Sequence, residues 1–239
     1  MKTPARRIGI LGGTFEPIHW GHLDLGDVAV SQLELSRLFV ITSNVPPHRP
    51  QPFASAYHRF AMVSLAILDH PDWRAAELEL RHRAPSFTSR TLDLFRERGY
   101  LPSELFFVIG ADAFAEIESW RDYPRILGLA HFAVVSRPGL SVKELPRRLP
   151  RLADRMAPPP IDEAASIDPL IILIDAPTAD VSSTAIRQRL AGGGDVAGLV
   201  PPHVQQHIEH HGLYSSMTPG RRRSDVPRIS AASRLHDKD

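Results

Sequence analysis

Cysteine is the first absence in this chain of 239 residues. A protein without cysteine has no disulfide, no thiolate zinc site and no cysteine nucleophile. Such a composition suits a reducing compartment, and we expect the chain to be cytoplasmic.

A long apolar run is also missing, and neither sign of charge dominates. No stretch reaches about 18 apolar residues, so we expect no membrane-spanning helix. The apolar run before Phe15 is too short for the core of a signal peptide. Lys and Arg number 28 and Asp and Glu number 27, which gives a net charge of +1. We therefore expect no membrane partner and no specific nucleic-acid partner, because selectivity for anions must be local.

Short apolar, β-branched runs alternate with helical patterns along most of the chain. This alternation is typical of βαβ units, which build a parallel sheet. The sequence thus predicts an α/β fold: a Rossmann-like, doubly wound parallel sheet with flanking helices and a small C-terminal helical part. One domain would span 1–214, with an insertion or mobile loop at about 140–168, and a disordered basic tail would occupy 215–239.

Hydrophobic periodicity gives the approximate bounds of the predicted elements, and Ser86 is the expected cap of the third helix. The predicted strands are 7–11, 37–42, 73–81, 104–109, 131–136 and 170–174. The predicted helices are 22–35, 57–68, 88–98, a stretch that ends near 129, 183–190 and 202–211.

The loop after the first predicted strand reads GGTFEPIHWGH at 12–22. In a doubly wound sheet, ligands bind at the carboxyl ends of the strands, where the start of a helix offers free N–H groups to phosphate. Two adjacent glycines let the backbone approach an anion closely. The loop therefore predicts a phosphate site.

His19 and His22 lie three positions apart, so both imidazoles can face one point at the helix start and donate to phosphate oxygens. The loop is neither a Walker loop nor a GxGxxG turn. A glycine turn with two surface histidines is one alternative interpretation. Another is a zinc site that includes His207, His210 or His211, which the lack of cysteine and of a helical HExxH motif disfavours.

A second candidate anion site follows the last predicted strand, where 181–187 reads VSSTAIR. Ser182 or Ser183 can cap the helix, and Arg187, one turn further on, can add a planar cationic fork. A simple helix cap is the alternative interpretation. Two phosphate sites at one edge of a sheet favour a triphosphate as the ligand.

These two motifs together resemble the nucleotidylyltransferase superfamily with its (T/H)xGH signature, and within it most closely the bacterial nicotinate-nucleotide adenylyltransferases. The resemblance covers about 7–214 apart from the 140–168 segment. Supporting segments are PPHR at 46–49, ELRHRAPSFTSRTL at 79–92, FFVIGADAF at 106–114, SWRDYPRIL at 119–127, SRPG at 136–139 and LVPPHVQQHIEHHGLY at 199–214.

The resemblance implies three groups of site residues. The implied catalytic residues are His19 and His22, at the α-phosphate, and Arg187, at the outgoing pyrophosphate. The implied ATP-binding residues are Gly12, Gly13, Thr14, Phe15, Gly110, Asp112, Ser183 and Thr184. The implied mononucleotide-binding residues are Pro47, His48, Arg49, Thr88, Trp120 and Arg137. For Trp120, stacking on a flat ring is the functional interpretation and a core position is the alternative.

Three positions depart from the pattern of that family. Glu16 stands where the family usually has Asp, Arg49 where Lys is common and Phe87 where Tyr is common. None of these changes removes an implied phosphate ligand, although Glu16 can shift the loop slightly.

The implied reaction transfers AMP from ATP to nicotinate mononucleotide, giving nicotinate adenine dinucleotide and pyrophosphate in NAD biosynthesis. The acceptor phosphate is already ionised, so alignment and charge stabilisation suffice without a covalent intermediate. Mg²⁺ would arrive bound through the ATP phosphates, with no metal ligand from the protein. Nicotinamide mononucleotide and pantetheine phosphate are alternative acceptors. A nucleotide-sensing protein that binds nucleic acid is the non-enzymatic alternative, and the oligomeric state is left open, a homo-oligomer included.

Overall fold

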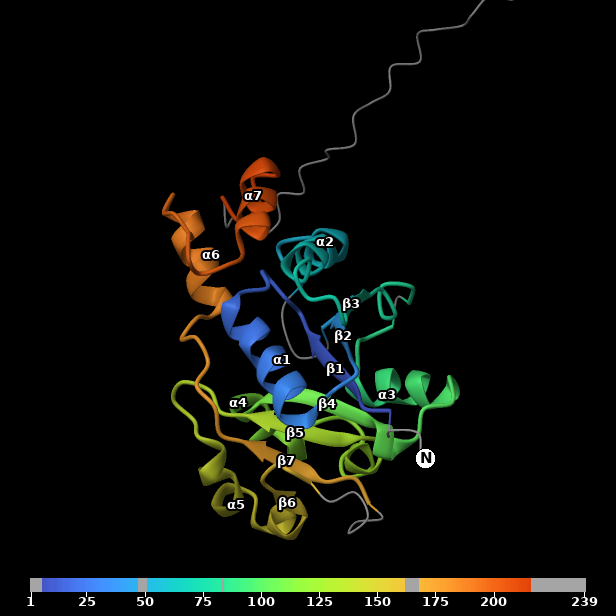
Figure 1. Cartoon of the computed structure of the whole chain (residues 1–239). Helices are drawn as coiled ribbons and strands as arrows, with labels where there is room; N and C mark the ends of the chain where they lie inside the picture. Colours follow the sequence, from blue (N-terminus) through green and yellow to red (C-terminus); the bar gives the residue numbers. More distant parts are fainter. Residues whose placement is uncertain (1–5, 47–50, 83, 162–167, 216–239) are drawn as a thin grey trace, which may run out of the picture.

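The computed structural model describes residues 6–46, 51–82, 84–161 and 168–215. A parallel sheet with strand order β3-β2-β1-β4-β5-β7-β6 forms its centre. Helices cover both faces of this sheet (Figure 1). The strands are β1 (Ile8–Gly13), β2 (Arg37–Thr42), β3 (Trp73–Ala76), β4 (Leu105–Gly110), β5 (His131–Val135), β6 (Met156–Ala157) and β7 (Ile171–Ile174). The predicted α/β fold is confirmed.

The α-helices lie between the strands in the sequence, and two more follow the last strand. They are α1 (Trp20–Leu33), α2 (Ala56–Ala66), α3 (Thr88–Glu97), α4 (Ala111–Phe114), α5 (Leu145–Arg148), α6 (Ser183–Ala191) and α7 (Pro202–His210). Single turns of 3-10 helix lie at Pro102–Glu104, Ile117–Ser119, Arg125–Gly128 and Val142–Glu144, and a longer one at Pro150–Arg155. The last α-helix, α7, packs against α2 at one end of the molecule (Figure 1).

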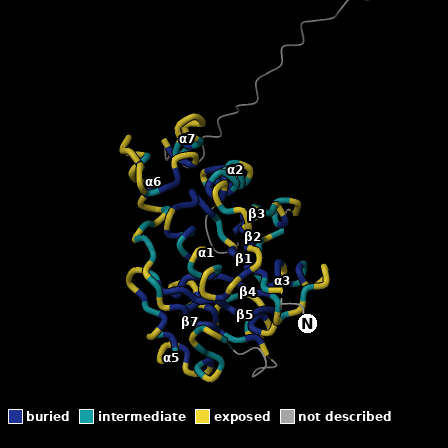
Figure 2. Tube along the Cα trace, viewed as in Figure 1, coloured by how far each residue is buried: buried dark blue, intermediate teal, exposed yellow. Residues whose placement is uncertain are grey.

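Alternation along the central strands divides the core in two. In β4, Phe106 and Val108 join the cluster that contains α1, α2, α6 and α7, whereas Phe107 and Ile109 join the cluster that contains α3, α4 and α5. Successive strand side chains point to opposite faces, so a strand with helices on both sides is apolar throughout. Every residue of β4 is buried, and the buried trace runs through the centre of the molecule (Figure 2).

The first strand continues further than its apolar run indicated. Gly12 pairs with Ile41 and Gly13 with Thr42, so β1 extends through both glycines. The next helix starts at Trp20 instead of His22. Conversely, β3 ends at Ala76, because 77–81 turn away where a strand was expected. The first motif is thus shorter as a loop and more firmly tied to the sheet than predicted.

Two other sequence predictions are wrong. The helical stretch expected before Leu129 is the short α4 followed by 3-10 turns. Asp122 adopts φ 66° there, and Pro124 cannot donate a helical hydrogen bond, so a continuous helix is interrupted. The cap expected from Ser86 is also absent: Phe87 precedes α3, and the Ser86 hydroxyl instead accepts from the N–H of Asn44 at 2.9 Å.

The segment expected to be an insertion or mobile loop is folded over most of its described length. Residues 142–157 form two 3-10 turns, α5 and β6, which pairs with β7. Leu145, Leu149 and Leu152 are buried in the core on this face of the sheet. These leucines recur at spacings of four and three, which is a helical period that the surrounding prolines obscured. The predicted disordered tail lies outside the described residues, apart from Ser215.

Candidate active site

A cavity of about 340 Å³ opens over the carboxyl ends of β1 and β4. This is the edge at which ligands bind in doubly wound sheets. The implied site residues that line it are Gly12, Gly13, Thr14, His22, Thr88, Gly110, Asp112, Trp120 and Arg137. Those described but not lining it are Phe15, His19, Ser183, Thr184 and Arg187. Pro47, His48 and Arg49 lie outside the described residues.

Phe15 belongs to the first loop, and its side chain is buried, with only 2% of the residue exposed. Its φ of 50° is left-handed, a conformation that non-glycine residues rarely adopt. The edge of its ring meets the His22 ring at a centroid distance of 5.1 Å. A Cβ on Gly13 would lie 2.9 Å from the Phe15 ring, so this glycine is required by close approach. Phe15 therefore supports the loop instead of contacting the cavity.

The two histidines stack at the start of α1. Their ring centroids are 3.7 Å apart with an interplanar angle of 29°. The His19 backbone N–H donates to Nδ1 of His22 at 3.3 Å. Because Nδ1 accepts this bond, a neutral His22 carries its proton on Nε2. His22 thus has an N–H donor on a ring that lines the cavity.

His19 is almost fully buried and uncharged in this state. Burial lowers the pKa of its imidazole to about 3, and the neighbouring Arg137 lowers it as well. Within the described part of the chain, Nδ1 of His19 has no hydrogen-bond partner. A phosphate oxygen or a water can pair with a buried polar atom of this kind. The positive charge beside the pair therefore comes from Arg137.

Arg137 ties the start of α1 to the segment before α6. Its guanidinium donates to the carbonyl of Gly21 at 2.9 Å and to that of Val181 at 3.3 Å. Asp24 adds a second tie by accepting from the Ala179 N–H at 2.6 Å. Arg137 lines the same cavity. It lies beside the stacked histidines, and its predicted role in binding the mononucleotide stays a prediction.

The second motif contacts the first directly. Ser182 caps α6 by accepting from the Ala185 N–H at 3.2 Å, as one of the two predicted caps. Ser183 donates its hydroxyl to the carbonyl of Pro17 at 3.0 Å, and Arg187 donates to the carbonyl of Glu16 at 2.7 Å. The N-terminus of α6 therefore lies against the histidine loop, and the two sequence motifs are in direct contact.

Sequence reasoning missed a buried arginine and a buried glutamate behind that loop. Arg59 is 1% exposed and donates to the carbonyls of Thr14 at 2.6 Å and Ser43 at 2.7 Å. Glu16 accepts from the Ala54 N–H at 2.7 Å, and burial raises its pKa while Arg187 and Arg59 oppose the rise. Arg59 sits within an otherwise ordinary helical pattern, so only the fold reveals its role.

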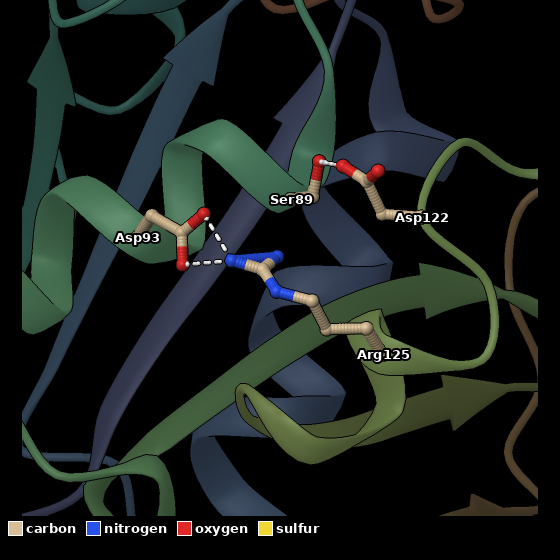
Figure 3. Close-up of polar contacts among 4 residues, drawn as sticks. All are labelled: Ser89, Asp93, Asp122 and Arg125. Atoms are coloured by element: carbon tan, nitrogen blue, oxygen red, sulfur yellow. Dashed lines mark hydrogen bonds and ion pairs between the residues drawn. The ribbon is translucent and has the colours of Figure 1, made fainter.

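The cavity lining also includes Thr88 and Trp120. Figure 3 shows how this part of the lining is fixed: Ser89 donates to Asp122 at 2.7 Å, and Arg125 forms an ion pair with Asp93 at 2.6 Å. Both contacts join α3 to the 120–125 segment. The edge of Trp120 meets Phe107 at a centroid distance of 6.4 Å. The Trp120 ring thus packs on the core and also lines the cavity, and its stacking on a flat ring stays a prediction.

Further polar residues line the cavity without having been named as site residues. They are Ser43, Glu79, Ser86, Thr91 and Arg121. All but Ser43 lie within or beside segments that carried the family resemblance, which was the available signal. Thr91 donates to Glu79, while burial raises the pKa of that carboxyl. Glu79 and Asp112 are the carboxylates in the described lining, and they come from different elements.

The sequence profile of the cytidylyltransferase-like family matches residues 10–189. This range includes both motifs and all the strands, except for the first two residues of β1. The fold and site therefore define a nucleotidyltransferase, and the chain belongs to the cytidylyltransferase-like family.

Curated relatives give a narrower class. A probable nicotinate-nucleotide adenylyltransferase of Roseiflexus sp. (strain RS-1) is 40% identical over 208 residues, which is 87% of this chain and 97% of that protein. The nicotinate-nucleotide adenylyltransferase of Salmonella typhi is 37% identical over 206 residues, 86% of this chain and 97% of that protein. Within the family, the chain belongs to the nicotinate-nucleotide adenylyltransferases.

A solved structure supports the fold. Nicotinic acid mononucleotide adenylyltransferase of Plasmodium falciparum, complexed with NaAD, superposes with a TM-score of 0.69 at 18% identity. The match covers 88% of this chain and 98% of that one. At this identity the likeness bears on the fold alone. Among the described residues, none of the helices has the length and apolar character that crossing a membrane needs.

Proposed function

We propose that this chain transfers AMP from ATP to nicotinate mononucleotide, releasing pyrophosphate and nicotinate adenine dinucleotide. The stacked pair of His19 and His22 beside the α6 N-terminus carries the proposal, in a chain of this enzyme family. A phosphate oxygen of the mononucleotide attacks the α-phosphorus of ATP. The bond from that phosphorus to the oxygen bridging the β-phosphorus breaks, and pyrophosphate leaves with the electron pair.

At the reacting phosphorus, His22 donates from Nε2 to an oxygen of the α-phosphate. Its Nδ1 already accepts the His19 N–H, so this tautomer is set before the substrate arrives. A donor that is fixed in advance stabilises developing charge without reorganising in the transition state. The buried His19 and Arg137 support the same region, His19 by stacking and Arg137 by charge.

At the departing end, the start of α6 offers free backbone N–H groups, a helix dipole and the side chains of Ser183, Thr184 and Arg187. Arg187 has one guanidinium nitrogen on the Glu16 carbonyl, and its other terminal nitrogen lies 3.2 Å from the Thr184 hydroxyl. It keeps further N–H groups for a phosphate. Ser183 and Arg187 therefore hold the loop as well as the pyrophosphate.

The two nucleosides occupy opposite parts of the cavity. Gly110 and Asp112, at the junction of β4 and α4, line the cavity, and we assign them to the ATP ribose. Thr88 and Trp120 form the wall for the flat pyridine ring. The donor set suits Mg²⁺ that arrives with ATP, because Glu79 and Asp112 do not form a carboxylate cage and Mg²⁺ usually keeps phosphate and water ligands. When bound, Mg²⁺ neutralises phosphate charge.

The test measures pyrophosphate release from ATP with four acceptors: nicotinate mononucleotide, nicotinamide mononucleotide, pantetheine phosphate and glycerol phosphate. We expect the highest kcat/KM with nicotinate mononucleotide, and no release when Mg²⁺ is removed. His22→Ala should lower kcat more than tenfold, because a donor at the transition state is lost, which costs about 2–4 kcal/mol in comparable sites.

His82→Ala is the matched control, since His82 is exposed and does not line the cavity. It should keep wild-type kcat. Release with pantetheine phosphate alone would overturn the acceptor assignment, and full activity of His22→Ala with an unchanged Tm would remove the role of His22.

A further inference from the structure

Three histidines converge outside the cavity. His58 comes from α2, His207 comes from α7, and His211 directly follows α7. One ligand nitrogen from each lies within 4.8 Å of the other two. None of the three lines the cavity over β1 and β4. They meet where α2 and α7 pack together, at one end of the molecule (Figure 1).

The fold aims these side chains at one point. His207 and His211 are four positions apart, so they lie on one face, while Val204 and Ile208 turn another face of α7 into the core. Two imidazoles at this spacing on a helix are a common pair of metal ligands. His58 approaches from the facing helix, with Nδ1 at 3.1 Å from Nε2 of His207.

These distances fit a tetrahedral metal site before metal binds. Zinc–nitrogen bonds of about 2.0–2.1 Å place two ligand nitrogens about 3.3–3.4 Å apart in a tetrahedron. The His58–His207 separation of 3.1 Å is already close to this value, and the wider separations are at most 4.8 Å. Rotation of side chains alone can close such gaps, since His211 is exposed at the helix end.

The local environment favours uncharged imidazoles. Burial lowers the pKa of His58 and of His207, and the neighbouring His211 lowers both further. Neutral imidazole nitrogens bind zinc, copper and nickel well, whereas Mg²⁺ prefers oxygen. One hydrogen bond between His58 and His207 would explain that pair, but it leaves the approach of His211 to both rings unexplained.

We propose that His58, His207 and His211 bind one Zn²⁺ ion with water as the fourth ligand, fastening α7 to α2. Zinc binding would also stabilise the loop that carries the first motif, because residues near the proposed ligands contact or lie close to that loop. Arg59, which follows His58, holds the carbonyl of Thr14, and Tyr214, beyond His211, is buried near Glu16 and Arg59. The ion is structural and takes no part in AMP transfer. The zinc site weighed from the sequence already included His207 or His211, but His58, which lies 149 residues before His207, was not among its ligands.

The test uses the full chain without an affinity tag, treated with chelator and then titrated with ZnCl₂. Isothermal calorimetry and a competing chromophoric chelator should give one ion per chain. At a hundredfold excess over Kd, Tm should rise by about 5–11 °C. Co²⁺ in place of Zn²⁺ should give the visible absorption of tetrahedral nitrogen coordination.

His58→Gln and His211→Gln should each weaken binding at least tenfold and, at the same ZnCl₂ concentration, lower the rise in Tm by about half or more, while kcat without zinc stays at the wild-type value. His203→Gln, at an exposed position on the same helix, and His22→Gln, in the cavity, should bind zinc as tightly as wild type. The proposal is overturned if no binding occurs up to about 100 μM, or if His58→Gln and His211→Gln bind zinc unchanged. The proposal is also overturned if His22→Gln is the only one of these variants that loses zinc binding.

Discussion

Replacing Arg59 by methionine should weaken both the fold and the reaction, although Arg59 does not line the cavity. Methionine keeps most of the side-chain volume and removes the charge and the donors. The carbonyls of Thr14 and Ser43 would each lose a short bond, and Glu16 would lose a neighbouring cation. Since Thr14 belongs to the first motif, the loop that presents His22 would loosen.

The expected loss in the free energy of unfolding is about 3–5 kcal/mol, because the carbonyls of Thr14 and Ser43 are left without their donors. Two unsatisfied carbonyls at about 1–3 kcal/mol each give a similar sum. For a chain of this length, such a loss corresponds to a Tm about 6–20 °C lower. Arg147→Met is the matched control, because Arg147 is exposed, and it should change stability by less than about 0.5 kcal/mol.

The loss should also depend on pH. Burial already raises the pKa of Glu16, and removing Arg59 raises it further. A carboxyl whose pKa is raised on folding adds stability below its unfolded pKa, and this contribution is lost as pH rises through the folded pKa. Arg59→Met should therefore be most harmful near pH 8 and least harmful near pH 5.

Urea unfolding of wild type, Arg59→Met and Arg147→Met at several pH values measures these differences, and pyrophosphate release measures kcat/KM. An Arg59→Met protein no less stable than Arg147→Met at pH 8 would refute the role of the buried cation. A loss of stability with the opposite pH trend would refute the coupling to Glu16.

Two further predictions test the packing and electrostatics of the site. A Cβ on Gly26 would lie 2.1 Å from the Trp73 ring, so Gly26→Ala should destabilise by about 1–3 kcal/mol, whereas Gly128→Ala, which meets open space, should not; thermal unfolding compares them. The pKa of His19 is lowered to about 3, so its contribution to stability is complete above about pH 6.5 and lost as pH falls. Between pH 6.5 and 4.5, wild type should lose about 2–3 kcal/mol more than His19→Gln in urea unfolding, and equal losses would show that His19 titrates normally.

The sequence predicted the order of the major elements because the apolar runs are strong and each is bounded by turn residues. It failed where local pattern and tertiary contact disagree. Gly12 and Gly13 indicated a loop, yet pairing with β2 keeps both in the strand. The proline-rich 140–157 segment hid a helical spacing of leucines that only the sheet face makes useful.

The sequence predicted the residues that face the cavity better than the residues that hold the motifs in place behind it. Residues that face the cavity, such as His22 and Asp112, belong to short motifs whose chemistry is legible in sequence. Residues that hold those motifs in place bind backbone carbonyls. Every residue type has such a carbonyl, so these contacts leave no pattern in the sequence. Arg59 donates to the carbonyl of Thr14, 45 positions away, and Arg187 donates to that of Glu16, 171 positions away. No local sequence pattern predicts contacts at such separations.

The two jobs given to Arg187 are compatible only because the side chain is an arginine. Its Nη1 donates to the Glu16 carbonyl and its Nη2 lies near Thr184, and each of these nitrogens carries a second N–H. A guanidinium can therefore keep the loop in place and still present a two-pronged donor to a phosphate. A lysine at this position would have one nitrogen for both tasks, and binding pyrophosphate would then compete with holding the loop that carries the reacting end of the site.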